Sequence, residues 1–291
     1  AEAPVSADRH AACVNHIVAL ATRLGIGDFG VHLGVALFCA ACAQPGGADA
    51  IEPELAATAC LKLADAFDEH SQEYYQREKT VAYYHGAGER WSMETILGAE
   101  KAVAQKLGFI VHRPTVAWFL RSCVHSGGRA LADMPDAVEL ARYIADLVLL
   151  DAGARVYPAA LLAQVALLLA VHAAAPGSGS HCVAGRAVPS PIAATQAAWA
   201  GIQLATCHAN QGELAAACFT QTVHTLCTLR GRWHARGLTA VEQRHPVAAR
   251  RLVLSSGAFP PELAGLLVAP QDGADGAGAP PAPDGSDVGS S

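Results

Sequence analysis

The residues of this sequence with the widest chemical scope are its cysteines and histidines. It contains 9 cysteines and 13 histidines, and the pair closest to a metal motif is Cys39 and Cys42, spaced as C-x-x-C. A structural zinc site needs a second pair of ligands at a suitable distance, and none follows. Residues three apart share one face of a helix, so this spacing favours two small buried side chains. The sequence therefore predicts no metal ion and no cofactor, with a cysteine–histidine nucleophilic pair as an alternative, because such partners meet only in the folded chain.

A glycine pattern near the start of the chain resembles a nucleotide-binding motif. Gly25, Gly27 and Gly30 match G-x-G-x-x-G. That motif requires a preceding strand, and helical sequence lies on both sides here, so a tight turn between helices is the better interpretation. The sequence also lacks G-x-x-x-x-G-K-[ST], G-x-S-x-G and H-E-x-x-H. We predict that the protein is not an enzyme.

The elements that position these residues are predicted to be helices. Stretches rich in alanine and leucine are separated by glycine and proline, and β-branched runs of period two are scarce. The polar stretch Ser71–Lys79 is expected to lead, without a helix, to a turn at 85–88. The fold class is therefore all-α, with two successive sets of about five helices. The expected helices are 7–24, 29–42, 52–70, 92–107, 114–125, 136–150, 157–175, 192–209, 212–230 and 239–244.

The charge of the chain is low and uneven. Only 16% of its 291 residues are charged, and the formal net charge is −6. Acidic residues alone follow Arg251, in a segment rich in glycine, proline and alanine that we predict to be a flexible tail. The remaining body is close to neutral, which argues against binding nucleic acid through its phosphates. The acidic residues of the tail are Glu262, Asp272, Asp275, Asp284 and Asp287.

The most apolar stretch is Ala159–Val171, interrupted by Gln164. A membrane-spanning helix needs about 20 apolar residues, so this stretch is expected to be a buried core helix and no membrane partner is expected. The odd number of cysteines and the absence of a secretory segment at the start favour reduced thiols. The expected location is the nucleus, the cytoplasm or both.

Several phrases, in order along residues 9–250, resemble the cyclin family. The most specific run contains Glu100, an aromatic residue nine positions later at Phe109, then Arg113-Pro-Thr and finally Phe119-Leu120. Other phrases resemble further helices of the two cyclin boxes: Leu24–Leu37, Ala59–Glu69, Leu140–Asp151 and Tyr157–Ala170.

The resemblance implies tandem five-helix cyclin boxes at 1–112 and 113–257, followed by a tail at 258–291. It implies a regulatory subunit that binds a cyclin-dependent Ser/Thr kinase as a heterodimer, through the third and fifth helices of the first box. The kinase supplies every catalytic group. The implied kinase-facing residues are Leu63, Ala66, Phe67, Asp68, Glu69, Glu100, Ala104 and Phe109.

This sequence departs from the family in three places, one of which is Cys39-Ala40 at the end of the second helix, where cyclins have Asp-Arg. The lysine that cyclins pair with the glutamate is expected to fall on Ala66, so Glu100 would lack its partner. Glu100→Ala is then expected to weaken kinase binding with little change in melting temperature. Phe109 could belong either to the core of the box or to the interface. The first-helix patch that docks substrates has lost its large apolar anchors, so no ordinary Arg-x-Leu docking is expected. Its counterparts are Arg9, Ala12, Cys13 and His16.

Two other functions stay open. The cyclin fold also serves as a scaffold in transcription-factor and pocket-protein families that do not activate kinases. Local basic patches, Arg230/Arg232/Arg236 or Arg244/Arg250/Arg251, would favour that alternative. A zinc or thiol enzyme is the third possibility.

Overall fold

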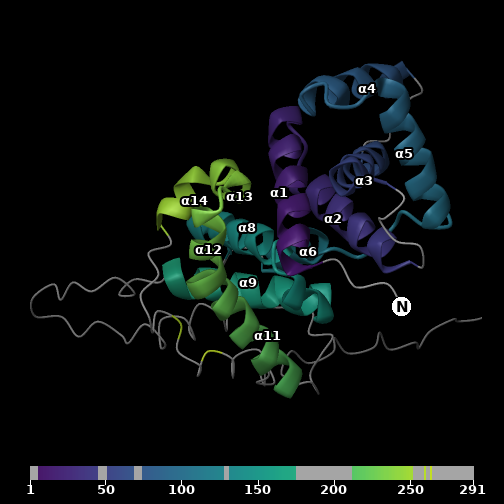
Figure 1. Ribbon diagram of the computed structural model, residues 1–291. Coiled ribbons are helices and arrows are strands. Elements are labelled where there is room, and N and C mark those ends of the chain that lie inside the picture. The colour runs from purple at the N-terminus through teal and green to yellow at the C-terminus, as the bar shows by residue number, and fades with distance from the viewer. Residues whose placement is uncertain are drawn as a thin grey trace, which may run out of the picture.

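The computed structural model describes residues 6–44, 51–68, 74–127, 131–174 and 212–251, together with Phe259 and Leu263. These residues form helices and turns, and no strand occurs among them. The predicted all-α class is confirmed. In Figure 1, helix α1 (Ala7–Leu24) stands between two groups of helices, one formed by the following segments and the other by the second half of the chain.

The first group is built around α3 (Pro53–Asp68), which packs against α1, α2 (Asp28–Ala43) and α5 (Met93–Lys106). Nearly every position of α3 from Leu55 to Asp65 is buried. A helix that is covered on all sides belongs at the centre of a domain. The turn between α1 and α2 begins at Gly25, which has φ +70° and caps α1, so the glycine pattern there is an interhelical turn.

One helix of this group was missed by the sequence prediction. Helix α4 (Tyr74–Gly86) covers most of the polar stretch that was expected to lack a helix. Gln, Arg, Glu and Lys are good helix formers, and the stretch continues into Tyr83, which is buried and donates a hydrogen bond from its hydroxyl to Asp65 (3.2 Å). Tertiary anchoring by a residue beyond the polar stretch therefore makes it helical.

The second group is built around α9 (Ala159–Ala174), whose residues 160–172 are all buried. This confirms that the most apolar stretch of the sequence is a core helix, and no helix among the described residues has the length and apolarity to cross a membrane. Helix α9 packs against α6 (Val116–Ser126), α8 (Pro135–Leu149) and α11 (Gly212–His224). The expected helix 192–209 lies outside the described residues.

The predicted helix 212–230 is not uniform. After α11 the chain forms a π-helical turn, η3 (Thr225–Leu229), and then α12 (Arg230–Ala235). The hydroxyl of Thr225 donates both to the carbonyl of Gln221 (2.9 Å) and to the buried Asp151 (2.7 Å). Threonine hydroxyls that bond to the preceding turn compete with the regular ladder, which accounts for the local widening. Asp151 also caps the 3₁₀ helix η2 (Ala152–Val156).

The two groups share one continuous apolar core. Helix α1 packs against α13 (Ala240–Arg244), and α2 contacts both α6 and α8. The last described helix, α14 (Pro246–Arg251), packs against α8. Helix α13, late in the chain, therefore packs against the first helix. The boundary predicted between residues 112 and 113 stays a prediction. The tail predicted from residue 258 lies outside the described residues, apart from Phe259 and Leu263.

A pair of glycines tests how closely α2 and α3 pack. A Cβ added at Gly34 would lie 3.1 Å from the Leu61 Cα, whereas a Cβ at Gly98 on α5 would meet nothing within 4 Å. We expect Gly34→Ala to lower the free energy of unfolding by about 1–3 kcal/mol through overpacking. Gly98→Ala is expected to raise it by about 0.5–1 kcal/mol, because alanine is the better helix former. Urea denaturation of both variants measures the difference; equal effects at the two positions would contradict this packing.

Candidate protein-binding surface

Glu100, the glutamate predicted to lie in the binding surface, is paired with a lysine of α3. The Nζ atom of Lys62 lies 2.5 Å from the Oε2 atom of Glu100 on α5. Lys62 is 4% exposed and Glu100 is 16% exposed, so the pair sits at the edge of the core. A buried ammonium needs such a partner, because burial of an unpaired charge is costly.

This pair corrects the expectation that Ala66 replaces the lysine and leaves Glu100 unpaired. Lys62 lies one helical turn before Ala66, on the same face of α3. The positive charge that pairs with Glu100 therefore comes from the preceding turn of this helix. The expectation that Glu100→Ala leaves the melting temperature nearly unchanged is withdrawn for the same reason. Removing the carboxylate would strand the Lys62 ammonium in a buried position.

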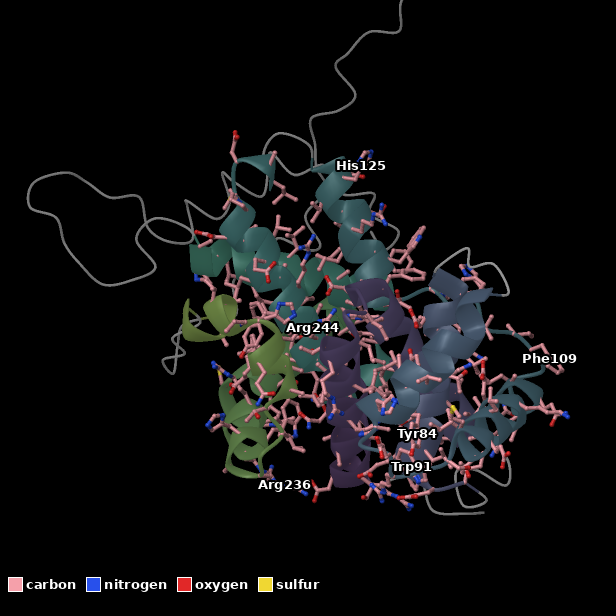
Figure 2. The ribbon with its side chains drawn as sticks, turned by 90° about the horizontal axis from the view of Figure 1, so that it is seen from above. Tyr84, Trp91, Phe109, His125, Arg236 and Arg244 are labelled. Atoms are coloured by element: carbon pink, nitrogen blue, oxygen red, sulfur yellow. The ribbon has the colours of Figure 1, made fainter. Side chains whose placement is uncertain are left out.

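At the end of α5 the backbone holds an aromatic side chain in solvent. Gly108 and Phe109 both adopt φ +60°, and the Phe109 amide donates to the carbonyl of Ala104 (2.8 Å). Phe109 is 70% exposed, and Figure 2 shows it at the outer edge of the molecule. The left-handed conformation costs a residue with a side chain about 1–2 kcal/mol. Because most of its side chain is in solvent, the interpretation of Phe109 as a core residue is wrong.

Most of the large exposed apolar side chains lie on α3, on α5 or just after α5. Eight large apolar side chains are exposed in the described part of the chain, and those between residues 67 and 110 are Phe67, Met93, Leu97, Phe109 and Ile110. Met93, Leu97, Glu100 and Ala104 are spaced three or four apart and form one stripe along α5. Such concentrations of apolar side chains mark interaction sites. We call the surface formed by Phe67, Met93, Leu97, Glu100, Phe109 and Ile110 the α3–α5 face.

The other predicted kinase-facing residues differ in their placement. Leu63, Ala66 and Ala104 are half-buried, and Leu63 packs against the core. Phe67 lies beside His112, which belongs to the segment between α5 and α6, and the two ring centroids are 5.8 Å apart. The backbone of Asp68 ends α3, while its side chain and Glu69 lie outside the described part of the structure.

Replacing Phe109 by glycine tests whether the chain holds this residue at a cost. Glycine adopts positive φ freely, and the Phe109 side chain makes little contact with the core. We therefore expect Phe109→Gly to keep or raise the free energy of unfolding, by up to about 1 kcal/mol. Chemical denaturation checks this, with Ile110→Gly as the matched control at an exposed residue without positive φ. A loss above that of the control would mean that the aromatic ring supports the fold.

The counterpart of the substrate-docking patch lies on α1. Arg9 is exposed, Ala12 is half-buried and Cys13 is 2% exposed. His16 is half-buried, with Nε2 2.8 Å from the hydroxyl of Thr58, and its ring meets Trp91 edge-on. The structure thus brings these four residues together on one helix without presenting a large apolar group among them. The predicted absence of Arg-x-Leu docking stays a prediction.

The cysteines of this region have the properties of core thiols. Burial raises the pKa of Cys39 to about 11, against a weaker opposite effect of Arg155, and also raises the pKa of Cys42. Burial raises the pKa of Cys13 to about 12. These thiols are therefore protonated at neutral pH, and a protonated thiol is a poor nucleophile. The pairs His181-Cys182 and Cys207-His208 lie outside the described residues.

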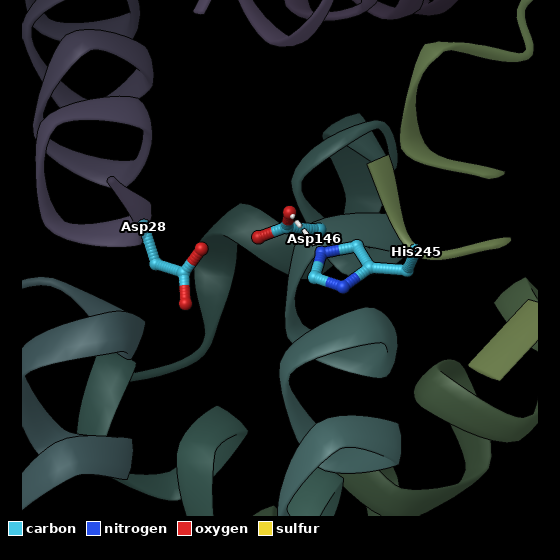
Figure 3. Close-up of side chains that lie close together, drawn as sticks. All are labelled: Asp28, Asp146 and His245. Atoms are coloured by element: carbon cyan, nitrogen blue, oxygen red, sulfur yellow. Dashed lines mark hydrogen bonds and ion pairs between the residues drawn. The ribbon is translucent and has the colours of Figure 1, made fainter. Parts of the chain in front are cut away.

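A second group of titratable residues, which the sequence did not reveal, joins the two groups of helices. Buried Asp146 on α8 accepts hydrogen bonds from His32 on α2 (2.8 Å) and His245 (2.9 Å), as Figure 3 shows for His245. Arg244 bridges Asp146 (3.4 Å) and Asp28 (2.9 Å). Asp28, Asp146 and His245 could each offer one ligand atom to a metal ion. The Arg244 guanidinium, however, already supplies the positive charge between the two carboxylates, which favours a structural link.

The pKa values of this group follow from its contacts. Burial alone would raise the pKa of Asp146, but the hydrogen bonds from His245 and His32 outweigh it and hold the pKa below its usual range. Burial alone would lower the pKa of His245, but the hydrogen bond to Asp146, its charge and the contact with Glu139 raise it. His245 is therefore a cation in the folded protein at a pH where a free histidine is neutral.

This coupling predicts a pH dependence. Because the pKa of His245 is raised in the folded state, its stabilisation is fully present below about pH 6.5, the unfolded value, and is lost as the pH rises through the folded value. The loss in free energy of unfolding caused by His245→Gln is thus expected to be larger at pH 6 than at pH 9. Denaturation of wild type and variant at both pH values measures it, and comparing the two proteins cancels the opposite trend of His10 and His16, whose pKa values burial lowers. A difference independent of pH would contradict the assignment.

The first suggested basic patch and one member of the second are largely neutralised within the described residues. Arg230 pairs with Glu242, Arg236 with Asp8, and Arg244 with Asp28 and Asp146. Arg232 is exposed, and the side chains of Arg250 and Arg251 lie outside the described part. These ion pairs weaken the case for direct contact with nucleic acid.

No protein-family model matches this chain, and no curated protein matches it.

Proposed function

We propose that the protein is a cyclin-like regulatory subunit that binds a Ser/Thr protein kinase through the α3–α5 face. The single observation that carries the proposal is the exposed Phe109, held in a left-handed conformation just after α5, the helix that also carries Glu100. A strained backbone that presents a large apolar group to solvent is characteristic of binding sites. The resemblance of the sequence to cyclins supplies the class of partner.

The helix arrangement supports the same proposal. Helix α3 is surrounded by α1, α2 and α5, and α9 is surrounded by α6, α8 and α11. Two groups of helices, each around one buried helix, are compatible with tandem cyclin boxes. In this reading α3 and α5 lie together on one side of the molecule, away from the second group in Figure 1.

The mechanism would be a population shift. A partner that binds the active conformer of a kinase more tightly than the inactive one moves the equilibrium by that difference in affinity. The apolar side chains of the α3–α5 face would supply contact area to one kinase conformer. The Lys62–Glu100 pair would fix the orientation, because charged groups at the edge of an interface set its register.

Recovery of the partner tests the proposal. The tagged protein is purified from its host, retained proteins are identified, and phosphate transfer by any retained kinase is measured with and without this chain. The proposal predicts a retained kinase that is stimulated. Retention of other proteins with no kinase activity would favour the scaffold alternative, and a kinase that is retained but not stimulated would remove activation from the proposal.

A further inference from the structure

A cavity of about 420 Å³ lies on the side of α2 that faces the second group of helices. Its walls come from α2, the start of α6, the end of α8, η2 and the start of α9. This size falls within the range of small-molecule sites. The α3–α5 face is formed by other residues, so a ligand of this cavity would be independent of the proposed binding to a kinase.

The chemistry of the cavity lining is one-sided. Among the described residues, the charged side chains that line it are Arg113 and Arg155, with no aspartate or glutamate, although the chain as a whole is acidic. Within the described part of the structure neither arginine pairs with a carboxylate. The remaining wall is largely aliphatic. Its apolar side chains include Val35, Ala40, Val116, Val148, Leu149 and Leu162.

Two buried nitrogen atoms of the lining have no hydrogen-bond partner among the residues that the structure describes. They are Nε of Arg113 and Nδ1 of His32, and His32 is 2% exposed. The other ring nitrogen of His32 is held by Asp146, which fixes the orientation of the ring. Buried polar atoms are rarely left unsatisfied in folded proteins, so two of them at one cavity indicate an absent partner.

We propose that this cavity binds a small organic anion, a carboxylate or a phosphate ester carried on a short aliphatic group. Guanidinium groups bind carboxylate and phosphate through charge-assisted hydrogen bonds. Arg113 and Arg155 would hold the anion, and the aliphatic walls would cover the rest of the ligand. The ring of His32 would contribute to the wall beside the two arginines, with its orientation fixed by Asp146.

Calorimetric titration of the full chain with four probes tests the charge and the apolar part separately. Hexanoate and hexyl phosphate carry both features, hexanamide lacks the charge, and inorganic phosphate lacks the aliphatic group. At least one of the two charged hexyl compounds is expected to saturate the protein and to bind at least about tenfold more tightly than hexanamide and inorganic phosphate. The tighter of the two identifies the anionic group.

Variants connect that binding to the cavity. Arg155 is exposed, so Arg155→Gln is expected to fold normally. Its affinity for the preferred anion is expected to be at least about tenfold lower than that of wild type. Arg113→Met is expected to do the same without lowering the melting temperature, because it removes a buried nitrogen that has no partner. Arg232→Gln, at an exposed position of α12, is the control and is expected to change the affinity less than twofold.

Three results would overturn the inference. They are the absence of saturable binding by both charged hexyl compounds, equal affinity for hexanamide or inorganic phosphate, and unchanged affinity in both cavity variants. A lower melting temperature of Arg113→Met with unchanged affinity would give Arg113 a purely structural role.

Discussion

Asp146→Asn is expected to lower the free energy of unfolding by about 3–5 kcal/mol at pH 7. Asp146 is 1% exposed, and its carboxylate is shared by His32, His245 and Arg244. Asparagine keeps the size of the side chain but removes the negative charge, so the positive groups around it lose their main partner. This residue also links α2, α8 and the segment at α13, so the effect extends over both groups of helices.

Urea denaturation of the full chain measures this loss. Asp133→Asn is the matched control, because Asp133 is exposed just before α8 and has no partner among the described residues. The control is expected to stay within about 0.5 kcal/mol of wild type. A loss below about 1 kcal/mol for Asp146→Asn would mean that the buried group does not hold the two groups of helices together.

Glu100→Ala is expected to lower the free energy of unfolding by about 3 kcal/mol, because it leaves the Lys62 ammonium buried without its partner. The double variant Lys62→Met/Glu100→Met is expected to recover to within about 1 kcal/mol of wild type, since apolar groups of similar volume can replace a buried ion pair. Binding to the proposed kinase partner is expected to remain weak in the double variant. Restored stability without restored binding would then separate the two roles of the pair.

The exposed Glu94 on α5 provides the control for this series. Glu94→Ala is expected to leave both stability and binding within the error of measurement. Thermal and chemical denaturation report on the fold, and titration with the kinase reports on binding. If the double variant binds as well as wild type, the pair serves only the fold, and the proposed interface has to rest on its apolar side chains alone.

The helices could be predicted from the sequence because their signals are local. The boundaries of α1 and α9 follow from glycine, proline and continuous apolar sequence, and the structure places them within a residue or two of the prediction. Helix α4 was missed because its first half has no apolar periodicity, and its anchor Tyr83 bonds to a residue on another helix. The π-helical turn at Thr225 depends on Asp151, 74 positions earlier, so no local pattern could reveal it.

The candidate surface was predicted only in part, for a related reason. The spacing from Glu100 to Phe109 selected both residues, but whether Phe109 is buried depends on the backbone at the end of α5. Lys62 was overlooked because the resemblance placed the lysine one turn later. A lysine inside an otherwise apolar helix, between Cys60 and Ala64, was the available signal. Such a lysine almost always has a partner when it is buried.

The group around Asp146 could not be predicted from the sequence. Its bonded pairs are separated by as many as 216 positions, between Asp28 and Arg244, and none of the members forms a motif with its neighbours. Aspartate and histidine at helical spacing are common on exposed faces, so neither residue stands out by itself. They come together because Arg244 and His245, at the end of α13, reach Asp28 on α2 and Asp146 on α8.

The most direct test of the proposed function is the affinity of the recovered kinase for three forms of this protein. These are wild type, Phe109→Ala, and Val156→Ala as a control at an apolar residue that is 76% exposed on η2, outside the α3–α5 face. We predict that Phe109→Ala binds at least about tenfold more weakly, as expected for an aromatic anchor at an interface, and that Val156→Ala binds within about twofold of wild type. Equal affinities for all three forms would contradict the α3–α5 face as the binding surface.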